Sequence, residues 1–192
     1  MDSREAIIQT TIDLIEERGE RLNTITVREI SRSAGVGLGL VNYYFENKDK
    51  LIAVCVERIV NGIVDRFTAI REQTDGLSPV EKLERLGNMT LDFLFEHRAV
   101  SKISMLTDMQ SPAENDNTQK TYSAYLSLVS ACRPDWDEER VKRKTFCLIT
   151  AMQQAFLRSD VILISQGVDL RNKTERRRFH RQILQDVLEL AA

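Results

Sequence analysis

Apolar residues recur at helical spacing along nearly the whole chain of 192 residues, and no segment alternates as a half-buried strand would. Ile8, Ile12 and Ile15 give the first example, because they lie four and three residues apart on one helix face. Only 3 residues are proline and 8 are glycine, so long helices are unobstructed. The pattern predicts an all-α fold of about nine helices.

Capping residues divide this pattern into separate helices. Thr26 followed by Glu29 forms a capping box, in which the threonine hydroxyl accepts the amide of residue 29 and the glutamate reaches back. Asn47 is a good cap for a long helix, and Ser78-Pro79-Val80-Glu81 combines an N-cap, a first-turn proline and a second capping box. We expect a first helix ending at residue 19, a loop over 20–25, and helices over 26–34, 36–44, 48–72, 78–97, 100–109, 118–132, 135–165 (with a weak point near 158–160) and 174–190.

Composition and charge exclude several classes of protein. The chain is 42% apolar and 29% charged, which is typical of a globular protein. Its net charge of −2 means that a nucleic-acid-binding surface must be a local patch, doubled by dimerisation. No apolar stretch approaches the ~20 residues that span a bilayer, and the first residues lack the order of a secretory signal. We therefore expect a cytoplasmic protein without a membrane partner.

The residues that commonly carry catalysis form no catalytic pattern. Cys55, Cys132 and Cys147 stand far apart among apolar neighbours, which predicts buried free thiols. Because only His97 and His180 accompany them, we expect no metal site and no cofactor. A helical enzyme is an alternative hypothesis. However, no nucleophile–base spacing, glycine-rich phosphate loop or paired-acid motif stands out, so we do not expect an enzyme.

One segment, residues 28–51, carries a specific pattern. It places Ala34-Gly35-Val36 between two short helices, Tyr43-Tyr44-Phe45 at the end of the second, and Asn47-Lys48 at the head of the next. Two short helices joined by a tight glycine-containing turn, behind a longer helix, are typical of a helix-turn-helix. In order and spacing these motifs resemble the DNA-binding segment of the TetR family of transcriptional regulators, over residues 4 to about 55.

The resemblance implies a domain organisation and a function. It implies an N-terminal three-helix helix-turn-helix domain over residues 1–47 and a helical effector-binding and dimerisation domain over 48–192. It also implies a homodimeric repressor that binds a pseudo-palindromic DNA operator and is released by a small, largely apolar effector of unknown identity. Two alternatives stay open. One is a regulator that activates or needs no effector, and the other is a protein-interaction module whose helix-turn-helix no longer reads DNA.

Nine residues are candidate DNA contacts. The first turn of the second helix offers amides and a positive dipole end to a phosphate, and an arginine there adds charge. In the recognition helix, glycines let the backbone approach the groove, an asparagine can pair with adenine, and leucines can touch a thymine methyl. A tyrosine hydroxyl can donate to phosphate, and the resemblance places a lysine on the DNA backbone. The candidates are Thr26, Arg28, Gly37, Leu38, Gly39, Leu40, Asn42, Tyr43 and Lys48.

The segment also departs from the family pattern. Gly37 and Leu38 stand where the family commonly has serine and a basic residue, and Leu40 and Asn42 replace the usual threonine and tyrosine. Lys and Arg do not outnumber Asp and Glu over residues 1–58. We therefore expect a modest electrostatic attraction to DNA and a shallow salt dependence.

The helical body carries the remaining candidates. Because one recognition helix makes few base contacts, two are usually held one helical turn, ~34 Å, apart. The resemblance places the dimer contact in the last two long helices, 137–165 and 174–190. Candidate dimer contacts are Ile149, Phe156, Phe179, Ile183, Val187 and Leu190. Candidate effector contacts are the Met and aromatic residues Met89, Phe93, Met105, Met109, Tyr122, Tyr125, Phe146, Met152 and Phe156. We interpret the basic run Arg176-Arg177-Arg178, with Arg181, as a solvated face.

Overall fold

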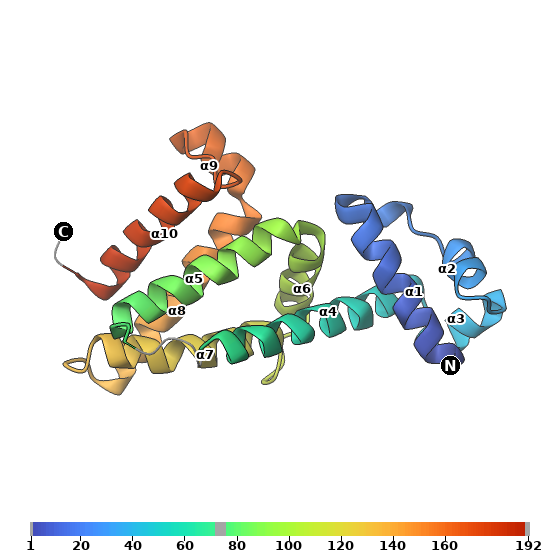
Figure 1. Ribbon diagram of the computed structural model, residues 1–192, viewed down its shortest axis with the longest axis horizontal. Coiled ribbons are helices and arrows are strands. Elements are labelled where there is room, and N and C mark those ends of the chain that lie inside the picture. Colours follow the sequence, from blue (N-terminus) through green and yellow to red (C-terminus); the bar gives the residue numbers. More distant parts are fainter. Residues whose placement is uncertain (1, 72–75, 191–192) are drawn as a thin grey trace. The chain divides into compact units, whose positions relative to one another are not determined.

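The computed structural model describes residues 2–71 and 76–190, with side chains except those of residues 20 and 62–71. Every regular element in these ranges is helical, which confirms the all-α prediction (Figure 1). The α-helices are α1 (Ser3–Arg18), α2 (Val27–Ser33), α3 (Leu38–Phe45), α4 (Lys48–Arg71), α5 (Pro79–Glu96), α6 (Arg98–Gln110), α7 (Asn117–Cys132), α8 (Glu138–Leu157), α9 (Ser159–Gln166) and α10 (Lys173–Leu188), and η1 (Gly19–Thr24) is a 3-10 helix.

Local capping sets the helix starts that the sequence predicts. At α2 the amide of Glu29 donates to Thr26 Oγ1 at 3.1 Å, and at α4 the Lys50 amide donates to Asn47 Oδ1 at 2.9 Å. At α5 both arms of the capping box form, since the amide of residue 78 donates to Glu81 Oε2 at 2.8 Å and the amide of residue 81 donates back to the serine hydroxyl at 3.3 Å. Each partner lies three residues away, which is why the sequence alone can predict these caps.

One predicted segment is wrong, because residues 20–25, expected to be a loop, lie mostly in η1, where Leu22 is buried. The weak point predicted near 158–160 is a true break. The segment 135–165 contains two helices, α8 and α9, bent by 85° at Arg158, whose φ of −111° and ψ of 20° are not helical. This break gives ten α-helices in the described residues instead of nine. The predicted end of α4 near residue 72 lies outside the described residues.

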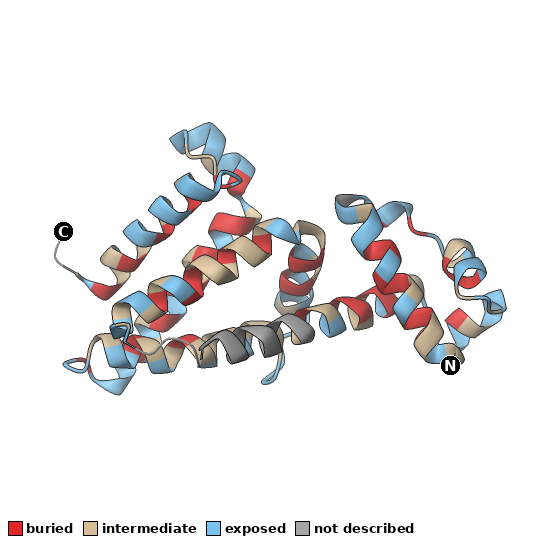
Figure 2. Cartoon of the chain, in the orientation of Figure 1, coloured by how far each residue is buried: buried red, intermediate tan, exposed pale blue. Residues whose placement is uncertain are grey.

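The chain divides into two compact units, and the first consists of Met1–Thr68 and His97–Pro112. It therefore contains α1, η1, α2, α3, most of α4, and α6. Its core is a cluster of Ile, Leu and Val side chains from these helices, joined by Val100 of α6. The predicted inner face of α1 is confirmed, because Ile8, Ile12 and Ile15 are all buried. Figure 2 shows buried positions recurring along this helix. These buried side chains hold α2 and α3 against α1.

The second unit consists of Ala69–Glu96 and Ala113–Ala192. In it α5, α7, α8 and α10 pack on one another, and α9 contacts α8. The buried residues form one stripe along each packed helix, while the opposite sides of the helices are exposed (Figure 2). Leu83 of α5, Val129 of α7 and Leu148 of α8 are fully buried at its centre.

An ion-pair cluster holds α10 against α5. Arg176 is 4% exposed, and its guanidinium donates to the Asp92 carboxylate at 2.6 Å. Burial alone would raise the pKa of Asp92, but hydrogen bonds from Arg176, Lys173 and Arg177 outweigh it and lower this pKa. The interpretation of the basic run as a solvated face is therefore wrong for Arg176, because a charge this deeply buried needs a partner.

A close helix crossing lies one turn further along α10. His180 is fully buried, and its Nδ1 lies 3.0 Å from Asn88 Oδ1 of α5. The imidazole ring occupies the space in which a Cβ atom at Gly87 would stand. The hydrogen of this glycine therefore lets the two helices approach, and Leu184 and Leu188 continue the buried stripe of α10.

A cluster around Trp136 fixes the end of α10. The guanidinium groups of Arg133 and Arg140 lie 4.4 and 4.6 Å from the centre of the indole ring. Arg133 also donates to the carbonyl of Leu188 at 2.5 Å, and Arg140 pairs with Glu189 at 2.5 Å. Cation–π contacts and charge-assisted hydrogen bonds together attach the last turn of α10 to the segment between α7 and α8.

The three thiols lie in different environments. Cys55 is buried, Cys132 is half-buried and Cys147 is exposed, so the prediction of buried thiols is wrong for Cys147. This residue points away from the buried side of α8, on which Leu148 and Ile149 lie. Burial raises the pKa of Cys55 to about 12 and that of Cys132 to about 11, which keeps both thiols protonated at neutral pH.

Two features of other classes of protein are absent from the described residues. No three His, Cys, Asp or Glu side chains in these residues gather as a metal site requires. No single described helix is long and apolar enough to cross a membrane, and α8 and α9 meet that test only as a pair bent by 85°.

Candidate nucleic-acid interface

The turn between α2 and α3 places the two helices of the motif. Gly35 has φ of +67°, a left-handed conformation that glycine adopts without a steric penalty. The amide of Val36 then donates to the Ser31 carbonyl at 3.0 Å, which closes the turn. Val41 and Phe45 of α3 are buried in the core of the first unit. These contacts determine which face of α3 points away from the core.

That outward face holds the predicted recognition residues. Tyr43 is 78% exposed and Leu38 is 50% exposed, and Asn42 is also exposed. Gly37 and Gly39 are exposed with no atoms near the position of a Cβ, so the backbone lies open at the start of α3. Leu40 is different, because it is half-buried and packs against the core of the first unit. Tyr44 has the same environment.

The predicted backbone contacts lie at the starts of α2 and α4. Thr26 and Arg28 are both exposed, and Thr26 caps α2. Lys48 is half-buried, and its ammonium group donates to the carbonyl of Ile25 at 3.1 Å. An ammonium group has three donors, so this bond leaves two for a phosphate. It also ties the start of α4 to the segment before α2.

One candidate contact was missed from the sequence. Arg32 is exposed on α2, four residues after Arg28. Residues four apart lie on the same side of a helix, so the two arginines form a short basic strip. Their spacing in the sequence is the signal that could have identified Arg32.

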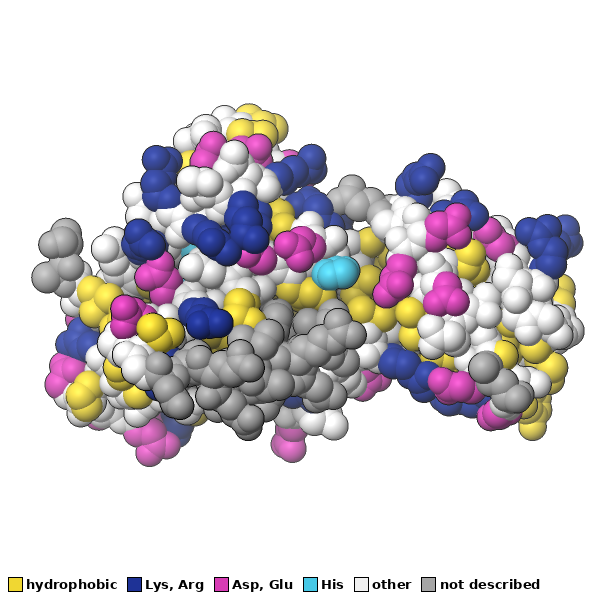
Figure 3. All heavy atoms as spheres, in the orientation of Figure 1, with side chains coloured by type: hydrophobic (Ala, Val, Ile, Leu, Met, Phe, Trp, Pro, Cys, Tyr) yellow, Lys and Arg dark blue, Asp and Glu magenta, His cyan; other side chains and the backbone are white. Residues whose placement is uncertain are grey.

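Ion pairs neutralise other basic groups of the first unit. Arg18 pairs with Glu29 at 2.5 Å, and Arg58 pairs with Glu5. Acidic and basic side chains are interspersed over the face drawn in Figure 3. This distribution agrees with a modest attraction to DNA that rests on a few local cations.

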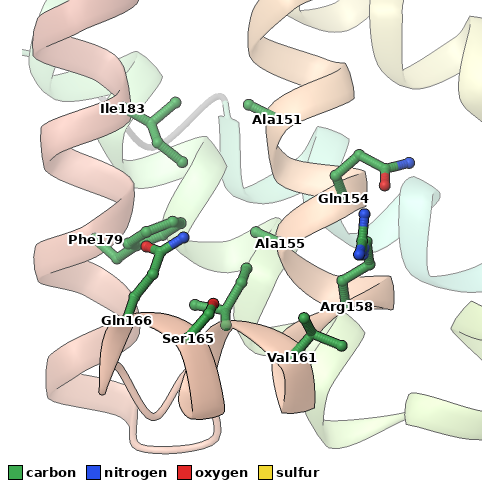
Figure 4. A pocket seen from close by; sticks show the side chains of 10 residues that line it. Ala151, Gln154, Ala155, Arg158, Val161, Ser165, Gln166, Phe179 and Ile183 are labelled. Carbon is green, nitrogen blue, oxygen red and sulfur yellow. The ribbon is translucent and has the colours of Figure 1, made fainter.

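A hollow of about 550 Å³ opens in the second unit between α8, α9 and α10 (Figure 4). Phe179 and Ile183 of α10 face Ala151 and Ala155 of α8 across it, and Val161 of α9 lies at one end. Among the candidate dimer contacts, Phe179 and Ile183 thus line a surface of the single chain.

The other candidate dimer contacts fall into two groups. Val187 and Leu190 are half-buried, like Phe179 and Ile183. Ile149 and Phe156 are buried inside the second unit. Because a dimer surface consists of side chains that a single chain leaves open, these two belong to the core.

The candidate effector residues are spread over both units. Met105 and Met109 lie on α6 in the first unit, and the others lie on α5, α7 and α8 in the second. Tyr125, Met152 and Phe156 are buried, Met89, Phe93 and Tyr122 are half-buried, and Phe146 is 64% exposed. The Tyr125 hydroxyl donates to Thr90 Oγ1 at 2.9 Å. The candidates on α5, α7 and α8 therefore lie at least partly buried in the second unit, except Phe146, whose side chain faces solvent.

Comparison with known proteins identifies the N-terminal segment. Residues 7–55 match the family model described as bacterial regulatory proteins, tetR family. The chain is 34% identical over 76 residues to the HTH-type transcriptional regulator BetI 2 of Chromohalobacter salexigens, a match that spans 40% of the chain and 36% of that protein. It is 29% identical over 179 residues to BetI 1 of the same organism, spanning 87% of the chain and 82% of the relative.

Solved structures extend the likeness to the whole fold. A TetR-like transcriptional regulator from Rhodococcus sp. RHA1 superposes with a TM-score of 0.63 at 16% identity, covering 98% of this chain and 97% of that one. A tetR-family regulator from Streptomyces coelicolor gives 0.58 at 20% identity, covering 97% and 78%. The matched family and these relatives are regulators, which disfavours the enzyme hypothesis. Residues 7–55 are therefore similar to bacterial regulatory proteins of the tetR family, and the fold of the chain is like that of solved TetR-like regulators.

Proposed function

We propose that this chain is a DNA-binding transcriptional regulator of the tetR family, and that it acts as a homodimeric cytoplasmic repressor released from its operator by a small, largely apolar effector. In this proposal residues 1–47 bind DNA, and residues 48–192 bind the effector and dimerise. The observation that carries the proposal is the α3 surface, because Leu38, Asn42 and Tyr43 stand exposed on a helix that Val41 and Phe45 anchor. An anchored helix with an exposed outer face suits insertion into the major groove.

Dimerisation follows from the size of that surface. One eight-residue helix reaches only a few base pairs, so operator specificity requires two copies about one helical turn apart. The hollow between α8 and α10 supports this part of the proposal, because its apolar residues Phe179 and Ile183 are open in the single chain. A second copy of the same surface would cover them.

The effector part of the proposal rests on side chains of the second unit. The aromatic and methionine side chains of α5, α7 and α8 support an apolar ligand, since Met and aromatic residues adapt to irregular apolar shapes. Such a ligand regulates only if it binds the operator-bound and released forms unequally. We therefore expect an effector to lower operator affinity rather than merely to bind.

The test is selection of bound sequences from a random duplex pool, with an Asn42→Ala, Tyr43→Phe double variant alongside. We expect a palindrome whose half-sites lie about one helical turn apart, and loss of this enrichment in the variant. A single unpaired half-site would contradict the homodimer. No enrichment even at low salt would contradict DNA reading by this chain alone.

The selected operator then serves to test regulation. It can be placed before a reporter gene to separate repression from activation, and a library of small apolar compounds can be screened for release of the bound protein. An increase in reporter expression on deletion of the regulator is the expected result. A decrease would favour the activator alternative.

A further inference from the structure

We propose that α3 reads a thymine in each operator half-site through the thymine methyl group, using Leu38. This inference rests on the proposed function and names what its recognition helix reads. The residues of α3 are Leu-Gly-Leu-Val-Asn-Tyr-Tyr-Phe, without lysine, arginine or a carboxylate. The bidentate arginine or lysine contact to guanine, which is the commonest specific contact, is thus not available from this helix.

Exposure separates the two leucines at the start of α3. Leu38 is exposed over 50% of its surface. Leu40 is less exposed, because it packs against the core of the first unit. Leu38 is therefore the large aliphatic side chain that α3 presents outward. In the free protein its exposed part faces water, so contact with an apolar group on the DNA would be favourable.

The surroundings of Leu38 allow close approach to a base edge. Its neighbours Gly37 and Gly39 have no side chain, and apart from the adjacent residues and the backbone of α3 nothing lies within 4 Å of where their Cβ atoms would be. Gly37 is also the N-cap of α3, without a side-chain hydrogen bond. Among residues 37–39 only Leu38 has a side chain, so its two chain neighbours do not hold it away from the floor of the groove.

The chemistry of the major groove then selects the partner. The thymine C5-methyl group is the apolar group that the four bases present there, and the other edges carry hydrogen-bond donors and acceptors. A leucine pressed against a donor or acceptor displaces water without replacing its hydrogen bond. Leu38 therefore favours thymine and disfavours bases whose polar edge it would cover.

Asn42 sets the position of this thymine relative to a second base. It lies four residues after Leu38 on the same side of α3, about 6 Å further along the axis. Stacked bases are ~3.4 Å apart, so the two side chains reach neighbouring or next-but-one base pairs. Because asparagine pairs with adenine, the half-site should contain an adenine and a thymine at this spacing.

The experiment replaces each half-site thymine of the selected operator singly by deoxyuridine, which removes only the methyl group. For the wild-type full chain we expect one position per half-site where affinity falls about fourfold, the effect of one buried methyl group. At that position 5-methylcytosine should also bind more tightly than cytosine. When deoxyuridine replaces this thymine in both half-sites, the two fourfold losses of operator affinity should multiply.

Two variants assign the effect to the side chain. Leu38→Ala should bind the thymine and deoxyuridine operators equally. Leu106→Ala is the matched control, because Leu106 is 39% exposed on α6 and lies outside the predicted DNA surface. It should keep the fourfold difference. Circular dichroism checks that both variants fold, and the deoxyuridine series uses wild-type protein and does not depend on them.

Each outcome decides the inference. A half-site without thymine, deoxyuridine operators that all bind like the thymine operator, or a Leu38→Ala variant that still distinguishes them would overturn it. If a palindrome is enriched in those cases, the proposed function stands. If no operator is enriched, the proposed function fails and this inference fails with it.

Discussion

At the scale of single residues, the backbone of Glu46 is the most constrained point near the recognition helix. Its φ is 64° and its ψ is −47°, and the amide of Asn47 donates to the carbonyl of Phe45 at 2.7 Å. This is a γ-turn with positive φ, which is rare and strained for a residue with a Cβ atom. It connects the end of α3 to the start of α4, so it sets how α3 leaves the core.

We predict that Glu46→Gly stabilises the protein by about 1 kcal/mol, because glycine removes the steric cost at positive φ. Thermal or urea unfolding measures the change. Glu46→Ala is the control, since it loses the ion pair with Lys50 but keeps the Cβ atom. If both variants change stability equally, strain at residue 46 is not the cause.

Lys48 is predicted to have two roles that can be separated. Its bond to the Ile25 carbonyl should contribute about 1 kcal/mol to stability, because Lys48→Met leaves a buried residue's carbonyl without that donor. If the remaining donors bind phosphate, the variant should also lower the slope of log affinity against log salt by about one per protomer.

The matched control for Lys48 is Lys50→Met. Lys50 is exposed and paired with Glu46, so its loss should leave the salt slope of the wild type. Operator binding measured at several salt concentrations distinguishes the two lysines. Equal slopes for wild type and Lys48→Met would restrict Lys48 to its structural bond.

Residues of this kind show what a sequence can predict locally. The caps at Thr26, Asn47 and Ser78 were predictable because donor and acceptor lie three residues apart. The bond from Lys48 to Ile25 spans 23 positions and has no local pattern. The strained turn at Glu46 could not be predicted from the sequence either, because a glutamate does not indicate a positive φ.

At the scale of elements, the crossing of α5 and α10 depends on one glycine. A Cβ atom at Gly87 would overlap the His180 ring, which is fully buried and held by Asn88. We predict that Gly87→Ala destabilises the protein by about 1–3 kcal/mol, because an overpacked core must shift. His180→Ala in the same chain should recover part of the loss, by making room for the new methyl group.

Urea unfolding of the two single variants and the double variant measures this coupling. The interaction free energy should be favourable in the double variant, by more than the scatter expected for independent sites. Additive losses would mean that the ring and the glycine do not compete for the same space.

The same histidine gives the second unit a pH dependence. Burial lowers the pKa of His180 to about 4. The negative charge of Glu84 acts in the opposite direction, but its effect on this pKa is smaller. In the unfolded chain the pKa is about 6.5. As pH falls from 6.5 to 4, the imidazole is therefore protonated in the unfolded state but stays neutral in the folded state. The free energy of unfolding decreases by up to about 3 kcal/mol over this range. This contribution is absent above pH 6.5.

Unfolding midpoints measured between pH 4 and 7 test this expectation. His180→Gln has an uncharged side chain that can still bond Asn88, so its stability should fall less over this range than that of the wild type. Parallel pH profiles would show that carboxylates elsewhere, and not His180, control the loss.

Helix existence was predictable from the sequence, whereas the partners of helix faces were not. The apolar stripes identified nine segments, and the polar residues near 158–160 marked the break at Arg158, but the 85° bend depends on φ and ψ values that the periodic pattern does not contain. The basic run of α10 suggested a solvated face, since Arg176 lies 84 positions from the Asp92 that pairs with it. Long-range pairs of this kind carry no signal in a single sequence.

At the scale of the whole molecule, the sequence predicted a DNA-binding segment and a helical body, and the packing adds that α6 belongs to the first compact unit. Contact between segments far apart in the chain determines such membership, which is why the candidate effector set was drawn from both units. The candidate dimer set was mixed for a similar reason. Apolar residues of α8 and α10 have the same spacing whether they face the core, as Ile149 does, or the hollow, as Ile183 does.

The dimer can be tested at one position on that hollow. Ile183 is half-buried on α10 and faces α8 across the open side of the unit (Figure 4). In the homodimer we propose, Ile183→Glu places two carboxylates in an apolar interface, where they lack partners. We predict a monomer by analytical ultracentrifugation and a loss of operator affinity of roughly 10²-fold or more, because the second half-site no longer binds intramolecularly.

Ile164→Glu is the matched control. This isoleucine is 85% exposed on α9 and does not line the hollow, so the same change there should leave the dimer and its operator affinity intact. Because Ile183 is only half-buried, the variant monomer should still fold, with the helical content of the wild type. A folded Ile183→Glu protein that remains dimeric would move the contact away from this face. A folded monomer that keeps the wild-type affinity would mean that one α3 is sufficient to read the operator.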